Sequence, residues 1–301
     1  MEKSIRKSFS RSGFVALVVV IIQIGVNAVL MPFLFPSINP STGNPFLVVI
    51  VPLLFGYAIS IPLSYLIVGK AKEHEKMPIK HDIPTGKIFA WFMVFFALSR
   101  IALLITTIIQ ALIVGDGFTD PVVELQLSSP WMMFVLATFI APVVEELIFR
   151  GLFYKALAPY GGKWYILISG LFFGLFHLNF TQIPFAFILG LFFAYVMYRT
   201  GNILIPILLH FITNLFSSIN MLFVSSKIGL LVVSSLVFAL IIAGLIVGIV
   251  LAVKGRIKED IIFEPASEET AKAKQVFINT GILLSIPVMI ILTFLLYLMQ
   301  E

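Results

Sequence analysis

Residues 141–150, Ala-Pro-Val-Val-Glu-Glu-Leu-Ile-Phe-Arg, place two adjacent carboxylates near one end of an apolar stretch that covers residues 131–149. A charged side chain within a membrane-spanning helix costs about 2.5–3.5 kcal/mol on insertion scales, so acids in such a position usually serve a function. Glu145 and Glu146 are also the only two of the 15 acidic residues that fall within a predicted span. The stretch therefore predicts a transmembrane helix with a site inside it.

The composition is that of a membrane protein. Of 301 residues, 60% are apolar and 12% are charged, and the mean hydropathy is +1.08. Such usage lies outside the range of soluble domains. Long Leu, Ile and Val runs predict helical spans, because the short alternating segments of an outer-membrane barrel are absent. We expect an all-α polytopic helix bundle, integral to a cell membrane and most simply a bacterial one.

Nine apolar segments can be delimited, and eight spans is the alternative count. The segments lie near residues 13–32, 46–68, 88–114, 130–157, 164–180, 185–198, 203–224, 228–253 and 275–299. The first is too long for the core of a signal peptide and lacks a convincing cleavage site, so we interpret it as an uncleaved anchor.

The basic residues predict the orientation of these spans. With a cytoplasmic N-terminus, the inner segments hold 18 of the 20 Lys and Arg residues, all except Arg100 and Lys227. This asymmetry is what the positive-inside rule requires, and it also places the C-terminus outside. The net charge of +5 is thus a topology signal, and we expect no nucleic-acid partner.

Few ionisable side chains lie within the predicted spans. Besides the two glutamates, they are Arg100, His177 and His210. Such groups usually face the interior of a bundle and mark a pathway or a site. Four of the five come from the fourth, fifth and seventh spans, whose short connections make them neighbours.

Helical spacing assigns the first partners. Glu146 and Arg150 are four residues apart with the acid first, the favourable orientation for an ion pair on one face. Glu145 is rotated by about 100° from Glu146 and is expected to point into a cavity without a local counter-ion. In the fifth span, Phe173 lies one turn before His177 and can wall its ring. On the same span, the glycines at positions 170 and 174 permit close approach of another helix.

His210 and Asn214, four residues apart in the seventh span, complete the candidate set. A carboxylate such as Glu145 and an imidazole such as His177 can position a water and remove its proton. His210 and the Asn214 amide can donate to an oxygen on which negative charge develops, worth about 3–4 kcal/mol per donor in a dry site. The set suits hydrolysis by an activated water. The chain has no Cys, which excludes thiol nucleophiles and thiolate metal sites.

Three motifs thus follow one another along the chain: Glu145-Glu146-x-x-x-Arg150, Phe173-x-x-x-His177 and His210-x-x-x-Asn214. Together they resemble the signature motifs of the CAAX protease and bacteriocin-processing (CPBP, Abi) family of intramembrane proteases. Residues 198–210 also resemble the stretch that typically precedes the third motif. The resemblance covers residues 140–216, and the three motifs in order at membrane depth form a strong signal.

The resemblance implies a glutamate-dependent endopeptidase that acts on a peptide or protein substrate in or at the lipid membrane. It implies that Glu145 and His177 activate water and that His210 and Asn214 form the oxyanion site. We also count Glu146 among the candidate catalytic residues, with Arg150 and Phe173 in support. The resemblance also implies no obligatory metal, although two His and two Glu could in principle bind Zn²⁺. The expected division is an accessory region of three spans (1–128), a catalytic core (129–224) and a region of two spans (225–301).

Other interpretations remain open for these residues. The pair of Glu146 and Arg150 can be purely structural, Asn214 alone is a common interhelical residue, and Arg100 is more simply a structural cation than a clamp for a substrate carboxylate. Buried Glu and His also form proton relays in transporters, although the chain shows no internal repeat. A silent scaffold or immunity factor that keeps the fold is a further alternative.

Overall fold

The computed structural model describes residues 2–35, 46–68, 83–114, 129–223, 226–256 and 271–298, and every regular element in these ranges is a helix. Within them, seven helices are long and apolar enough to cross a membrane. Two shorter apolar helices, Gly162–Phe176 and Leu204–Ile219, lie at the predicted fifth and seventh segments. The all-α polytopic bundle is confirmed, and the protein is an integral, multi-pass membrane protein. His74 and His81, with most of the predicted basic loop around them, fall outside the described residues.

The helices begin and end close to the predicted segments. Their bounds are α1 Glu2–Gly25, η1 Val26–Leu30, α2 Met31–Leu34, η2 Phe46–Ile50, α3 Val51–Val68, α4 Thr85–Val114, α6 Pro130–Val135, η3 Leu136–Ile140, α7 Ala141–Glu146, η4 Leu147–Leu152, α8 Phe153–Leu157, η5 Ala158–Tyr160, α9 Gly162–Phe176, α10 Gln182–Thr200, α11 Leu204–Leu222, α12 Lys227–Val253, α14 Ala273–Phe277 and α15 Thr280–Leu298. From α6 to α8 the chain is one continuous helix with changes of pitch, and it carries the glutamates.

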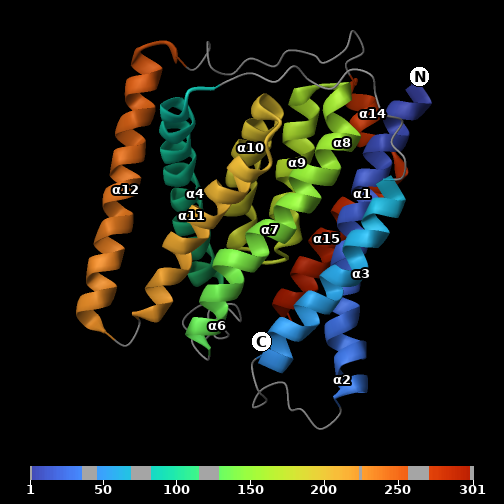
Figure 1. The fold of residues 1–301 in the computed structure, drawn as a ribbon, viewed down its shortest axis with the longest axis horizontal. Helices are drawn as coiled ribbons and strands as arrows, with labels where there is room; N and C mark the ends of the chain where they lie inside the picture. The colour runs from blue at the N-terminus through green and yellow to red at the C-terminus, as the bar shows by residue number, and fades with distance from the viewer. Residues whose placement is uncertain are drawn as a thin grey trace.

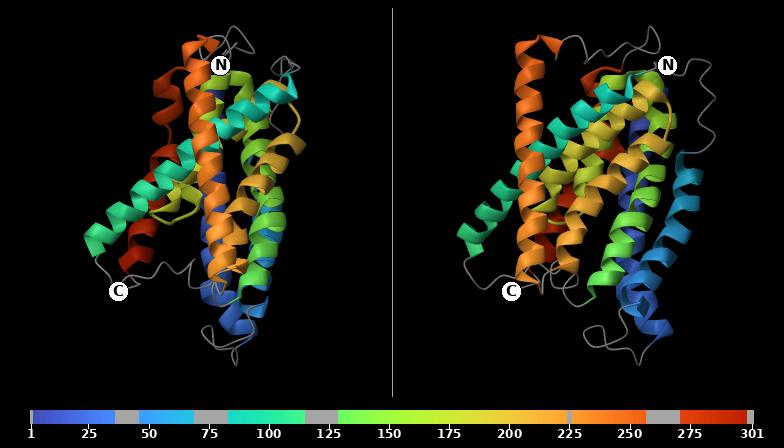
Figure 2. Two further views of the ribbon diagram at one scale, coloured as in Figure 1. Left: turned by 90° about the vertical axis from the view of Figure 1, so that its left-hand side faces the viewer. Right: turned by 60° about the vertical axis from the view of Figure 1, so that its left-hand side comes forward.

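The glutamate-bearing helix lies in the middle of the bundle, together with α9, α10 and α11 (Figure 1). Helix α9 packs against α10, and α11 packs against α10, α6 and α7. On one side α1 packs against α3 and α15, and on the other side α4 packs against α10 and α12. Figure 2 shows α12 at the edge of the molecule. The flanking helices thus enclose the segment that holds the three motifs.

Glycines bring α9 and α10 into backbone contact, as the spacing in the fifth span predicted. A Cβ added at Gly190 would lie 3.0 Å from the Cα of Gly170, and one added at Gly174 would lie 2.8 Å from the carbonyl oxygen of Ile183. No side chain can be accommodated there without separating the helices. The close approach fixes His177, at the end of α9, relative to α10.

The chain ends lie at opposite ends of the bundle (Figures 1 and 2). The connections from α8 to α9 and from α10 to α11 lie at the same end as the N-terminus (Figure 1). They carry Lys155, Lys163 and Arg199 on or next to them. This arrangement agrees with an odd number of crossings and with basic residues on one side, while the cytoplasmic orientation of that side stays a prediction from the positive-inside rule.

Candidate active site

The glutamates lie between two wide turns of their helix. In the first, η3, the N–H of Ala141 bonds to the carbonyl oxygen of Leu136, five residues back, and not to that of Ala137. The next residue is Pro142, which has no N–H to donate. The Ala137 carbonyl oxygen therefore receives a hydrogen bond from neither of the two residues whose N–H could reach it within the helix. Such π-type turns occur often at functional sites.

Asn214 of α11 supplies the missing donor. Its Nδ2 donates to the Ala137 carbonyl oxygen over 2.8 Å, and the hydroxyls of Thr138 and Ser218 are 2.9 Å apart in the same interface. A buried carbonyl without a partner costs about 1–3 kcal/mol. The contact therefore ties α11 to the glutamate-bearing helix, as the interhelical interpretation of Asn214 expected.

The second wide turn, η4, follows the glutamates and is completed in the same way. The N–H of Phe153 bonds to the carbonyl of Ile148 and leaves that of Phe149. The hydroxyl of Ser169 in α9 donates to the Phe149 oxygen over 2.9 Å. Two widened turns are thus fastened to two different helices, on either side of Glu145 and Glu146.

Glu146 forms the predicted ion pair with Arg150. Arg150 Nη1 lies 2.8 Å from Glu146 Oε1, and both side chains are fully buried. The guanidinium also donates to the carbonyl oxygen of Gly190 over 3.0 Å and lies 4.3 Å from the centroid of the Phe173 ring. A buried charge needs such a partner and further hydrogen bonds to be tolerated. The pair therefore locks the helix to α10.

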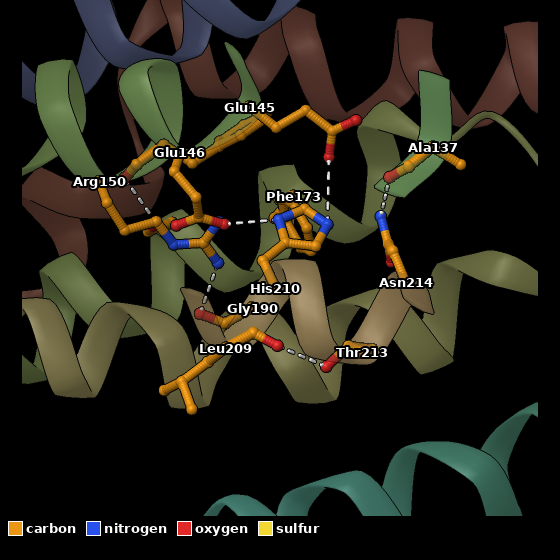
Figure 3. Close-up of polar contacts among 12 residues, drawn as sticks. Ala137, Glu145, Glu146, Arg150, Phe173, Gly190, Leu209, His210, Thr213 and Asn214 are labelled. Atoms are coloured by element: carbon orange, nitrogen blue, oxygen red, sulfur yellow. Dashed lines mark hydrogen bonds and ion pairs between the residues drawn. The ribbon is translucent and has the colours of Figure 1, made fainter. Parts of the chain in front are cut away.

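His210 contacts both glutamates, which the spacing alone did not predict. Its Nδ1 lies 2.9 Å from Oε1 of Glu146, and its Nε2 lies 4.0 Å from Oε2 of Glu145 (Figure 3). Because Glu146 is paired as a carboxylate, Nδ1 carries the proton of this hydrogen bond. In the neutral ring, Nε2 then presents a lone pair toward Glu145. The Arg150–Glu146–His210 chain orients the imidazole as a carboxylate orients the histidine of a hydrolytic triad.

Glu145 differs from its neighbour in having no cation beside it. Its side chain is 10% exposed, and Oε2 makes no hydrogen bond within the described part of the chain. Glu145 lines a cavity of about 280 Å³ together with His177. At a volume of about 30 Å³ per liquid water, this cavity has room for several waters. The expected division between a paired Glu146 and a cavity-facing Glu145 agrees with this geometry.

His177 closes α9 at the edge of this cavity. Its Nδ1 lies 2.9 Å from the Phe173 carbonyl oxygen, which can only accept, so Nδ1 is the protonated nitrogen and Nε2 is an acceptor. The predicted contact with the Phe173 ring is present, with 5.3 Å between centroids. The next residue, Leu178, has φ +47° and lines the same cavity. A left-handed conformation costs a non-glycine residue about 1–2 kcal/mol. This strained residue therefore marks the cavity wall, as strain often marks a functional site.

Arg100 lies away from this cavity. It donates to the Thr213 carbonyl oxygen over 3.2 Å and to the Ser217 hydroxyl over 2.6 Å. Its guanidinium also lies 4.7 Å and 4.8 Å from the ring centroids of Phe96 and Phe185. These contacts join α4 to α11 and favour the structural interpretation over a clamp for a substrate carboxylate.

The far wall of the cavity comes from α1, η1 and α3 and was not predicted from the sequence. Six residues there line it: Val20, Gln23, Ile24, Asn27, Leu53 and Tyr57. The available signal was weak, because only polar Gln23 and Asn27 in the first apolar run and Tyr57 in the second distinguish this wall from lipid-facing sequence. Nothing in their spacing relates them to the glutamates.

That no metal is required stays a prediction from the sequence. Glu146 and His210 are bonded to each other, and no group of three or more His, Asp or Glu side chains is positioned to hold an ion among the residues that the structure describes. Structural and catalytic zinc sites use three or four protein ligands.

The fold and the site define an all-α membrane protein with a buried cluster of two glutamates, an arginine and a histidine beside a cavity of about 280 Å³. Residues 127–216, which contain all three motifs, match the family described as type II CAAX prenyl endopeptidase Rce1-like. This match confirms the family resemblance predicted from the motifs.

Two bacterial proteins are similar to this chain. The "Putative membrane peptidase YdiL" of Bacillus subtilis (strain 168) is 30% identical over 86 residues, which cover 28% of this chain and 35% of that protein. The "Membrane-embedded CAAX protease MroQ" of Staphylococcus aureus (strain USA300) is 27% identical over 169 residues, covering 52% of this chain and 68% of that protein. No solved structure gives a significant match.

Proposed function

We propose that this protein is an intramembrane endopeptidase of the glutamate type, which hydrolyses a peptide bond of a membrane-associated substrate. The carrying observation is that Glu145, an acid without a cation partner, shares one cavity with His177. The names of the matching family and of the two relatives support a peptidase.

In this mechanism the cavity holds a water against Glu145 and His177. Glu145 removes a proton from the water as its oxygen attacks the carbonyl carbon of the substrate. The C–N bond then breaks, and the proton passes to the leaving nitrogen. Nε2 of His177, an acceptor in the neutral ring, helps to orient the water.

Glu146 has a different role in this proposal. Its charge is balanced by Arg150, and it holds the His210 ring so that Nε2 faces Glu145. Once Glu145 has passed the proton of the water to Nε2 of His210, 4.0 Å away, this N–H can donate to the developing oxyanion, and the same proton then reaches the leaving nitrogen. Asn214 can contribute the second hydrogen of its amide, since the first is used on Ala137.

Replacement of Glu145 by Gln tests the proposed function. The amide keeps the shape but cannot take a proton, so we expect loss of peptide-bond cleavage by a factor of about 10²–10⁴. Membrane peptidomes from cells with wild-type, Glu145→Gln and His177→Ala protein identify peptides that only the wild type produces. A quenched fluorogenic peptide that spans the cleaved bond then measures the rate in proteoliposomes.

Because the description of the matching family names a CAAX prenyl endopeptidase, this peptide is made with and without an S-farnesyl cysteine. Expression level and thermal midpoint serve as controls for folding. Identical peptidomes in wild-type and Glu145→Gln membranes, with both proteins folded, would overturn the proposal in favour of a silent scaffold.

A further inference from the structure

The three motifs form only one side of the cavity that holds Glu145 and His177. The other side belongs to α1, η1 and α3, which lie outside the matched residues 127–216. A substrate that reaches Glu145 must therefore contact these helices as well. The polar groups of these helices are therefore candidate hydrogen-bond donors to the carbonyl oxygen of the substrate.

Of the three polar residues on this wall, two are amides that each use one of their hydrogens in a bond to the backbone. Nδ2 of Asn27 donates to the Gln23 carbonyl oxygen over 2.9 Å, and Nε2 of Gln23 donates to the Leu53 carbonyl oxygen over 3.4 Å. Tyr57 is the third. The residue is 5% exposed, and its hydroxyl makes no hydrogen bond within the described residues. The Tyr57 hydroxyl is thus the uncommitted O–H donor of the cavity.

The position of Tyr57 is fixed by close packing on both sides of α3. A Cβ at the preceding residue, Gly56, would overlap the Gln23 amide, so the absence of a side chain there lets α1 and α3 meet. Helix α3 also packs against η4, the turn that directly follows the two glutamates. The Tyr57 ring is therefore held between the N-terminal helices and the helix that carries Glu145.

The motif residues have few free hydrogen-bond donors for an oxyanion, and the Tyr57 hydroxyl can supply one. Nδ1 of His210 is used on Glu146, and one amide hydrogen of Asn214 is used on Ala137. An oxyanion that forms in a low-dielectric cavity needs donors already in place, and removal of one such donor typically lowers kcat by 10²–10³. A phenol donates without introducing a buried charge.

We propose that Tyr57 is a catalytic residue whose hydroxyl donates a hydrogen bond to the carbonyl oxygen of the scissile peptide bond. This assignment rests on the proposed function. It makes the N-terminal helices part of the active site, with the substrate backbone held between α3 and α7 and its carbonyl oxygen directed at α3.

Tyr57→Phe tests this role, because it removes the hydroxyl and keeps the ring. With the fluorogenic peptide defined above, we expect kcat to fall by about 10²–10³ and KM to change by less than about threefold. The matched control is Tyr65→Phe on the same helix, where the side chain is 61% exposed and the rate should stay at the wild-type level.

A second measurement separates a catalytic from a structural role. A phosphinate peptide that mimics the tetrahedral intermediate should bind Tyr57→Phe more weakly by the same factor by which kcat/KM falls. An unchanged kcat in Tyr57→Phe, with Glu145→Gln inactive, would overturn the role of Tyr57 and leave the protease standing. A fall in kcat without weaker phosphinate binding would also overturn it. Retained cleavage in Glu145→Gln would overturn the proposed function itself.

Discussion

Glu145 and Glu146 are chemically identical neighbours that the fold places in opposite surroundings. Glu146 is fully buried between Arg150 and His210, whereas Glu145 faces a cavity and has no cation beside it. A carboxylate with two charge-assisted hydrogen bonds is held in place, and one without them is available to react. The difference arises from a rotation of about 100° between consecutive helical residues.

Arg150→Met should destabilise the protein strongly. It leaves the Glu146 carboxylate buried without its cation, which typically costs 3–5 kcal/mol. Thermal unfolding in detergent, with urea unfolding where it is reversible, measures the loss.

A double-mutant cycle with Glu146→Gln supplies the control for this prediction. Because the second change removes the stranded charge, Glu146→Gln/Arg150→Met should be more stable than Arg150→Met alone. A double variant no more stable than the single one would show that the arginine acts through Gly190 and the aromatic rings instead of through the ion pair.

Part of the site could be predicted at this scale. Glu146 and Arg150 lie on one helix, so spacing alone fixes their relation, as it does for Phe173 and His177. The contact of His210 with Glu146 joins two helices, and the rotation of one helix about its axis relative to another is not contained in either spacing. Tyr57 was missed for the same reason.

At the scale of elements, the two wide turns explain why the central helix accepts side chains from its neighbours. Each turn frees a carbonyl oxygen, and Asn214 and Ser169 donate to these oxygens. Pro142 is visible in the sequence, but the wide turn beside it depends on the hydrogen bond that Asn214 donates from α11. The wide turn therefore could not be predicted from the local sequence pattern.

Pro142 and Asn214 should therefore be energetically coupled. In the wild-type background, Asn214→Ala leaves the buried Ala137 carbonyl without a hydrogen bond and should lower the free energy of unfolding by about 1–3 kcal/mol. Pro142→Ala restores a backbone N–H that can reach the freed carbonyls, so the cost of Asn214→Ala should be smaller in that background. Unfolding of the four proteins of this double-mutant cycle measures the coupling.

Equal costs of Asn214→Ala in both backgrounds would contradict this account. Ser169→Ala provides a comparison, since it orphans the Phe149 carbonyl at a turn without proline. Its cost should not depend on residue 142.

At the scale of the whole molecule, composition predicted the fold class. Apolar run length located the seven helices of the described residues that are long enough to span a membrane, because a spanning helix needs about 20 apolar residues, and it also located the two shorter apolar helices. The packing of α3 against α1 and η4 could not be predicted, because lipid-facing and partner-facing apolar residues look alike in sequence. This is why the N-terminal spans seemed unrelated to the site.

The orientation of the bundle can be measured at the two ends of α12. The positive-inside rule places Lys227 outside and Lys254 inside. Lys227→Cys should react with a membrane-impermeant maleimide in intact cells, whereas Lys254→Cys should react only after permeabilisation. The parent chain has no Cys and serves as an unlabelled control. Labelling of Lys254→Cys alone in intact cells would reverse the topology.

Helix α12 packs mainly on α4, and only 6% of the residues in its apolar window are buried. Acyl chains do not distinguish Leu from Ile or Val, so substitutions among them can accumulate along most of this helix without harm. The exception is Gly244, where any side chain would collide with the Met93 backbone of α4. Among distant homologues, sequence identity should be lost earliest along α12. Within this helix, Gly244 should be the residue that is retained longest.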